Sequence, residues 1–204
     1  NEIVPEWYLL PFYAILRADA VVVPVNPMLL IDELRHTVED SGARVALSAQ
    51  ELLPQLQPLR VEGLIEHAII ARYADYVGDS DDPMPDWVRH SHPSAFDSIF
   101  TPWDKAISAA KPPAPHQAGP NDLACMPYTS GTTGRPKGCM HTHRNMMFPV
   151  VSAALWAGGS PDHKVLACLP MFHVTGMQIS MNAAIYTSAT LIIMPRWDRD
   201  LAGR

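Results

Sequence analysis

Short apolar runs alternate with amphipathic segments along most of the chain. Runs such as 20–23 (AVVV) and 191–194 (LIIM) have the length of buried strands, whereas apolar residues spaced by three or four, as in 30–41, are typical of helices. This pattern predicts strands at 21–23, 44–47, 67–71, 122–128, 139–141, 164–169 and 190–194. It predicts helices at 7–16, 30–41, 142–157 and 176–186.

Capping residues and prolines refine these boundaries. The helix at 30–41 places Leu30, Leu34 and Val38 on one face, and Gly42 is suited to end it in the left-handed conformation. Thr142 is suited to cap the start of the next long helix, which Pro149 is expected to kink or interrupt. A short helical piece after residue 47 is expected to be broken by Pro54.

Strands that alternate with helices and are apolar throughout indicate an α/β fold, with a largely parallel sheet and helices on both faces. We expect residues 1–204 to form one partial domain. Residues 76–120, rich in proline and acidic side chains, are expected to form a surface excursion with a short helix at 94–100. Aromatic residues such as Trp87 and Trp103 would pack this excursion against the core.

Composition narrows the classes of protein. The chain is 48% hydrophobic and 18% charged, as in folded globular proteins, and no apolar stretch approaches the ~20 residues that cross a bilayer. A formal net charge of −6 argues against a nucleic-acid surface. Three widely spaced cysteines, Cys125, Cys139 and Cys168, indicate reduced thiols and a cytoplasmic location. Contact with a membrane surface and a homodimer both stay open.

The stretch 128–138, YTSGTTGRPKG, is the strongest candidate for chemistry. It combines three glycines, which free the backbone, with hydroxyl side chains and two cations, Arg135 and Lys137. A plain glycine turn would not need these donors. The Walker pattern fails twice, because Pro136 stands where it requires glycine and Gly138 where it requires Ser or Thr. We therefore expect a hydroxyl-rich flap between two strands that folds over phosphates.

This stretch resembles the signature of the acyl-adenylate-forming ligases, the superfamily of acyl-CoA synthetases, luciferases and peptide-synthetase adenylation domains. Two further stretches support the resemblance: 169–177 (LPMFHVTGM) and 17–29 (RADAVVVPVNPML). In the second, the family more often has glycine where this chain has Asp19. The resemblance runs over nearly the whole chain except 76–120.

The resemblance implies activation of a carboxylic acid, in particular a fatty acid, by ATP to acyl-AMP, followed by transfer to coenzyme A. Donors in the flap would stabilise charge on the departing phosphates. It assigns ATP binding to the following residues: Thr129, Ser130, Gly131, Thr132, Thr133, Gly134, Arg135, Pro136 and Lys137. Lys137 would also be catalytic, and Thr129 would be a hydroxyl ligand of Mg²⁺.

The second motif implies the acyl site. His173 would hold or gate the acyl carboxylate, as a catalytic and substrate-binding residue, and Val174, Gly176 and Met177 would line the substrate pocket. A packed core histidine is the alternative for His173, and core packing is equally compatible with Met177. The pairs His141/His143 and His90/His92 lack a third ligand at a recognised spacing, which argues against catalytic zinc.

Functions outside acyl-CoA synthesis stay open. An amino-acid-activating adenylation domain usually has Asp after the Phe that corresponds to Phe172, whereas this chain has His173. The sequence is also compatible with a luciferase-type oxygenase and with a non-catalytic nucleotide-binding module. The family's ribose-binding aspartate, adenine-contacting segment and C-terminal catalytic domain have no counterpart in the sequence. We therefore expect 1–204 to be the front part of a longer enzyme, inactive alone.

Overall fold

A computed structural model describes residues 8–72, 100–109, 111–129, 134–194, 197 and 199–203. The chain divides into two compact units. Unit 1 consists of Asn1–Leu29 and Pro113–Arg204, and unit 2 is the intervening segment Leu30–Pro112. Each unit is an α/β arrangement with parallel strand pairing, as the sequence predicts.

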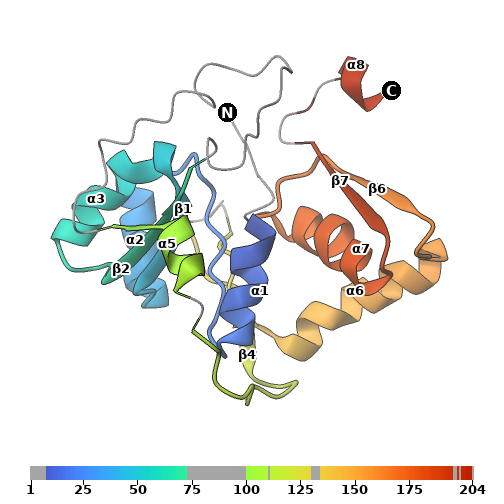
Figure 1. The fold of residues 1–204 in the computed structure, drawn as a ribbon, viewed down its shortest axis with the longest axis horizontal. Helices are drawn as coiled ribbons and strands as arrows, with labels where there is room; N and C mark the ends of the chain where they lie inside the picture. The colour runs from blue at the N-terminus through green and yellow to red at the C-terminus, as the bar shows by residue number, and fades with distance from the viewer. Residues whose placement is uncertain are drawn as a thin grey trace. The chain divides into compact units, whose positions relative to one another are not determined.

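Unit 2 contains a three-stranded parallel sheet (Figure 1). Its strands are β1 (Val45–Ala49), β2 (His67–Ala71) and β3 (Thr101–Pro102), in the order β1-β2-β3. Its helical elements are α2 (Ile31–Ser41), the 3₁₀ turn η2 (Gln50–Leu52), α3 (Leu53–Val61) and α5 (Trp103–Ser108). Apolar side chains from the sheet and from the helices, including Leu34, Leu59 and Ile70, are buried between them.

Two details of unit 2 differ from the sequence-based expectation. Leu30 precedes α2 as its N-cap and is 71% exposed. Its backbone N–H donates to the Glu33 carboxylate and its carbonyl accepts from Leu34 N, whereas the side chain does not join the buried face. Pro54 does not break a helix but lies in the first turn of α3, where a missing N–H costs nothing. Gly42 ends α2 with a φ of 69°, which confirms its predicted left-handed cap.

Within the expected excursion, β3 and α5 lie in the described residues. Trp103 and Phe100 are buried in unit 2, with 6% and 8% exposure. The expected helix at 94–100 and the aromatic residue Trp87 fall, except for Phe100, outside the described residues.

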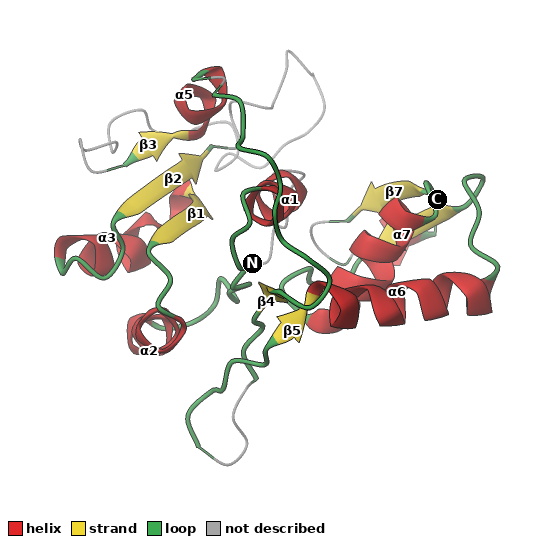
Figure 2. Ribbon diagram, turned by 90° about the horizontal axis from the view of Figure 1, so that it is seen from below, coloured by secondary structure: helices red, strands yellow, loops and turns green. Residues whose placement is uncertain are grey.

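Unit 1 contains a long helix and a two-stranded parallel sheet, and both pack against the helical segment 176–186 (Figures 1 and 2). Its strands are β4 (Leu123–Cys125), β5 (His141–Thr142), β6 (Lys164–Ala167) and β7 (Thr190–Ile193). Its helices are α1 (Leu9–Arg17), α6 (His143–Ala157), α7 (Ala183–Tyr186) and α8 (Arg199–Ala202), and the π-helical turn η5 (Gly176–Asn182) precedes α7. β6 and β7 pair in parallel, whereas β4 and β5 are antiparallel.

The expected strand at 21–23 is reduced to a single bridge. Val22 pairs with Cys125 in parallel, and its backbone is bonded to Ala124 O (2.9 Å) and Met126 N (2.8 Å). This bridge attaches the segment after α1 to β4.

Helix α6 begins as predicted but is not interrupted. Thr142 accepts a hydrogen bond from Asn145 N (3.2 Å) as its N-cap. The helix continues across Pro149 to Ala157, so the prediction that Pro149 interrupts it is wrong. Met146 and Val150, one turn apart, are buried on its inner face, and this packing holds the helix together where the proline removes one backbone bond.

Asp19 has a structural role that the sequence did not reveal. Its φ is 57°, a left-handed conformation that Asp tolerates better than most residues, which explains how it can stand where the family more often has glycine. Its carboxylate accepts hydrogen bonds from the backbone N–H groups of Gln117 (3.0 Å) and Ala118 (3.1 Å) and pairs with His116 (2.5 Å). The residue therefore fastens the segment 116–118 to the end of α1.

Candidate phosphate flap and acyl site

Residues 127–129 and 137–139 form two paired arms that leave β4 and β5 (Figure 2). Tyr128 and Gly138 form an antiparallel bridge, Thr129 N donates to Lys137 O (3.0 Å) and Cys139 N donates to Pro127 O (2.9 Å). The predicted flap between two strands is thus a hairpin, although the strands beside it are shorter than expected.

Only part of the predicted phosphate-binding set can be located. Thr129, Gly134, Arg135, Pro136 and Lys137 are described, whereas Ser130, Gly131, Thr132 and Thr133 lie outside the described residues. Thr129, Arg135 and Lys137 are exposed. The hydroxyl oxygen of Thr129 accepts from Lys137 N (3.4 Å), which holds the first and last of these residues opposite each other.

The cationic side chains of the hairpin are available to an anion. Among the described residues, neither Arg135 nor Lys137 forms an ion pair. Gly138 allows the arms to approach closely, since an added Cβ would lie 2.8 Å from Met126 Sδ and 3.1 Å from the Tyr128 ring. The hairpin thus presents two positive charges and a hydroxyl on a narrow, paired stem.

His173 stands at the start of the helix formed by η5 and α7. Its Nδ1 accepts a hydrogen bond from Thr175 N (3.3 Å), so a neutral ring carries its proton on Nε2. Its backbone is fixed on both sides: His173 N donates to Pro170 O (3.1 Å) and Met177 N donates to His173 O (2.9 Å). The side chain is exposed, so a packed core histidine does not describe it.

The other predicted acyl-site residues have two different environments. Val174 is 40% exposed beside His173. Gly176 and Met177 are buried, and Met177 belongs to the core of unit 1 together with Met171, Met181 and Met146. Gly176 lies so close to the preceding turn that an added Cβ would be 2.3 Å from Pro170 O.

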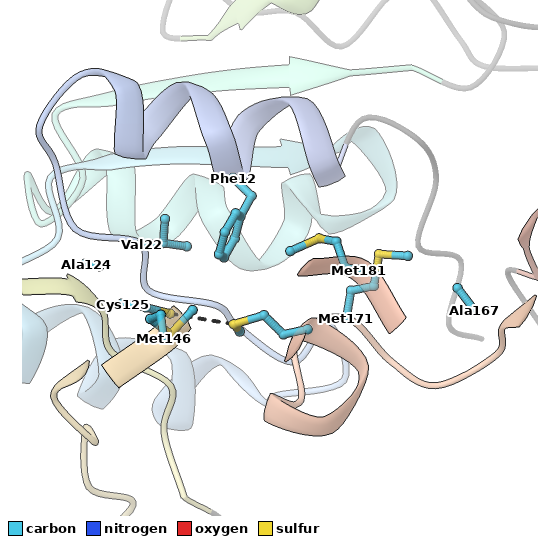
Figure 3. Packing of buried hydrophobic residues seen from close by; sticks show 9 residues of the cluster. Phe12, Val22, Ala124, Cys125, Met146, Ala167, Met171 and Met181 are labelled. Carbon is cyan, nitrogen blue, oxygen red and sulfur yellow. Dashed lines mark hydrogen bonds between the residues drawn. The ribbon is translucent and has the colours of Figure 1, made fainter. Parts of the chain in front are cut away.

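The same core connects the hairpin to the His173 helix (Figure 3). Cys125, at the end of β4, donates to Met177 Sδ on η5 (3.9 Å), which is the dashed line in Figure 3. Burial raises the pKa of the Cys125 thiol to about 12, so it remains a neutral packing group. The strand that leads into the hairpin and the turn that carries His173 therefore pack on each other.

The two motifs and the fold that carries them agree with one family. The family model described as AMP-binding enzyme matches residues 3–204. The chain belongs to the AMP-binding enzyme family.

Relatives of this AMP-binding enzyme are named as CoA ligases of different carboxylic acids. A long-chain fatty acid–CoA ligase of Mycobacterium tuberculosis is 30% identical over 187 residues, covering 92% of this chain and 32% of that protein. A long-chain fatty acid–CoA ligase of Bacillus subtilis is 27% identical over 203 residues, covering 93% and 35%. A 4-coumarate–CoA ligase of Arabidopsis thaliana is 28% identical over 207 residues, covering 97% and 33%. The chain thus spans about a third of the length of the curated relatives it matches.

Solved structures agree on the fold. ATP-bound MatB from Rhodopseudomonas palustris superposes with a TM-score of 0.73 at 22% identity, covering 98% of this chain and 35% of that one. The N-terminal domain of a Mycobacterium tuberculosis protein, FACL13, superposes with a TM-score of 0.66 at 27% identity, covering 98% and 44%.

The sequence analysis did not predict a hydrogen-bonded row of polar side chains that follows the motif at 169–177 of this AMP-binding enzyme. Gln178 and Asn182 are hydrogen-bonded to each other, and Asn182 is bonded to Tyr13 of α1. Their spacing of four on a helix was the only sequence signal for the bond between them. No sequence pattern indicated the bond to Tyr13, which is distant in sequence.

Metal sites and membrane spans are both absent from the part of the chain that the structure describes. There, no three His, Cys, Asp or Glu side chains are grouped so that they could hold a metal ion. None of the described helices combines the length and apolarity needed to span a bilayer.

Proposed function

We propose that the full-length protein carrying this chain is an AMP-forming acid–thiol ligase. It would activate a carboxylic acid with ATP to an acyl-adenylate and transfer the acyl group to coenzyme A. The observation that carries the proposal is the hairpin 127–139, whose paired arms present Thr129, Arg135 and Lys137 to solvent.

The hairpin residues suit the phosphate end of ATP. Negative charge builds on the leaving pyrophosphate, and donors aimed at it in advance lower the barrier without reorganisation. Lys137 supplies a point charge, Arg135 a planar set of donors, and Thr129 a hydroxyl. Ser130, Thr132 and Thr133 are proposed to add hydroxyls, with Gly131, Gly134 and Pro136 shaping the turn between the arms.

Magnesium fits this site as an ion held mainly by substrate phosphates. Mg²⁺ usually keeps several waters and takes only one or two protein ligands. Thr129 is exposed, and its oxygen, which accepts from Lys137 N, is a hydroxyl of the type that could serve. When bound, the ion would neutralise part of the phosphate charge.

We propose that His173 holds the acyl carboxylate. Its Nδ1 is occupied by Thr175 N–H, so Nε2–H is the donor that remains for an incoming oxygen. Val174 and Gly176 would form the wall beside it, whereas Met177 would support the wall from the core.

A hydrophobic acid, such as a fatty acid, fits the acyl motif best. From Leu169 to Tyr186 the sequence contains no Lys, Arg, Asp or Glu. An amino acid would need a carboxylate for its ammonium group, and a dicarboxylate would need a cation for its second carboxylate. Exposed Val174 and Ile179 instead offer apolar contacts.

ATP–pyrophosphate exchange by the full-length protein tests the function, with palmitate, 4-coumarate, malonate and amino acids as substrates. Replacing Thr132, Thr133 and Lys137 together by alanine should lower exchange by at least roughly 10²-fold, since one such donor is typically worth 10²–10³. Lys164→Ala, at an exposed lysine in β6, is the matched control and should exchange normally.

Three results would overturn the proposal. Normal exchange by the triple variant removes the role of the hairpin. Exchange that responds to amino acids only makes the protein an adenylation domain of the peptide-synthetase type. Calorimetric binding of ATP-Mg²⁺ without exchange for any acid makes it a nucleotide-binding module.

A further inference from the structure

A chain of polar side chains extends from partly buried Tyr13 and Asn182 to buried Gln178, beside the apolar core of unit 1. Tyr13 OH donates to Asn182 Oδ1 (2.5 Å), and Asn182 Nδ2 donates to Gln178 Oε1 (2.8 Å). Gln178 Nε2 in turn lies 3.0 Å from Met146 Sδ. The chain therefore ties α1 and α6 to the π-helical turn η5.

This arrangement is costly unless every member is paired. Gln178 is only 3% exposed, and its neighbours Met177 and Met181 are completely buried. A buried amide that loses its partner incurs the full desolvation penalty, whereas an apolar side chain of similar size would avoid the risk. A fully paired network, in contrast, fixes one arrangement of the elements that it joins.

The network acts on the turn that carries His173. Met177 N donates to His173 O (2.9 Å), so the residue beside Gln178 is bonded to the histidine itself. The turn is packed tightly against the preceding residues at Gly176, where an added Cβ would lie 2.3 Å from Pro170 O. π-helical turns are rare overall, and those that occur are frequently found at functional sites.

Burial raises the pKa of the Tyr13 hydroxyl from its ordinary value to about 12, so this group stays a donor to Asn182 well into the alkaline range.

We propose that Gln178 and Asn182, held by Tyr13, are positioning residues that fix η5 and thereby aim the His173 imidazole at the acyl carboxylate. The role of His173 in this statement depends on the proposed function. In this proposal the three residues act through the turn and not by contact with the substrate.

Tyr13→Phe tests the proposal with the loss of a single oxygen, and Gln178→Met, which keeps the length of the side chain, is the second variant. Tyr186→Phe, at a tyrosine that is 51% exposed, is the matched control. All variants are made in the full-length protein. Exchange kinetics are measured with the acid and ATP varied separately, and unfolding midpoints are recorded in parallel.

The kinetic expectation separates positioning from stability. Both network variants should lower kcat/KM for the acid about tenfold or more, the scale of a small misplacement at a reacting group, with KM for ATP nearly unchanged. Tyr186→Phe should match the unaltered protein. Equal kcat/KM in all variants, with only the unfolding midpoint lowered, would make the network purely structural and overturn the proposal.

A second readout does not require turnover. Diethylpyrocarbonate attacks the unprotonated ring nitrogen, and in His173 this is Nδ1, which Thr175 N–H covers. Peptide mass spectrometry should find His173 modified roughly threefold to tenfold faster in the network variants, the range that one net hydrogen bond spans. His163, which is exposed, serves as the internal reference.

The two readouts distinguish the two proposals. If the full-length protein activates no acid, the proposed function fails, and the modification rate of His173 still decides whether the network positions the ring. An unchanged rate in both network variants would refute the inference even if the enzyme is fully active.

Discussion

Gly176→Ala is the substitution whose effect the structure specifies most directly. The added Cβ would lie 2.3 Å from Pro170 O and 2.8 Å from Leu169 O. Both atoms belong to the backbone, so no side chain can rotate away. The 2.3 Å contact is about 1 Å shorter than the ~3.3 Å at which carbon and carbonyl oxygen ordinarily meet.

The magnitude follows from two contributions. Forcing one methyl group into a close-packed region typically costs ~1–3 kcal/mol. Moving the 169–170 turn away would also strain the bond from His173 N to Pro170 O, a loss of about 1 kcal/mol. We expect the free energy of unfolding to fall by about 3 kcal/mol, a large fraction of the stability of an ordinary domain.

Equilibrium unfolding in urea, followed by circular dichroism, measures the change. Gly119→Ala is the matched control, because its Cβ would meet only Asp122 Oδ2 at an ordinary 3.6 Å. That substitution should be neutral or stabilising by up to ~1 kcal/mol, through the smaller entropy of the unfolded chain. A midpoint for Gly176→Ala equal to that of Gly119→Ala would refute the packing described for this turn.

Three further outcomes are expected. Thr142→Ala should lower the unfolding free energy by about 1 kcal/mol because the α6 cap is lost, whereas Thr142→Ser should not; a urea midpoint shared by both variants would contradict this. Asp19→Asn should destabilise the chain at neutral pH. Hydrogen bonds from Ala118 and Gln117 and the charge of His116 hold the pKa of Asp19 below its ordinary value. The stability that the carboxylate adds is therefore present above the ordinary pKa and is lost as pH falls through the lowered one. Thermal melts from pH 7 to pH 3 check this, and an advantage that grows on acidification would disprove it. In a thiol titration of the native chain with a disulfide reagent, exposed Cys139 should react quickly and Cys125 only after unfolding, because burial raises the pKa of Cys125 to about 12; rapid labelling of both would contradict the described core.

Local patterns predicted most of the elements because their causes are local. β2 was predicted at its observed bounds, and the Gly42 and Thr142 caps follow from side-chain types at helix ends. The hairpin was predicted because a plain glycine turn does not need the hydroxyl and cationic side chains that are concentrated in this stretch. Its similarity to a known signature then gave the family.

The errors and omissions have a common cause in contacts that are distant in sequence. The strand expected at 21–23 is one bridge, because Val22 finds only β4 beside it among the described residues. The continuity of α6 across Pro149 depends on the burial of Met146 and Val150 by other elements. Likewise, no periodicity could show that Asp19 reaches Gln117, or that Tyr13 reaches Asn182.

The shared core explains how the two candidate segments can be held in register. Cys125 belongs to the strand that leads into the hairpin, and Met177 belongs to the turn that follows His173, and these two side chains touch. Under the proposed function, the hairpin acts on the leaving phosphates and His173 on the attacking carboxylate, the two ends of one displacement. Such a displacement depends on the alignment of both ends, because a misplacement of about 1 Å can lower the rate roughly 10²-fold. Packing both segments against one methionine-rich core, and fixing that core with the polar chain from Tyr13 to Gln178, gives this alignment a structural basis.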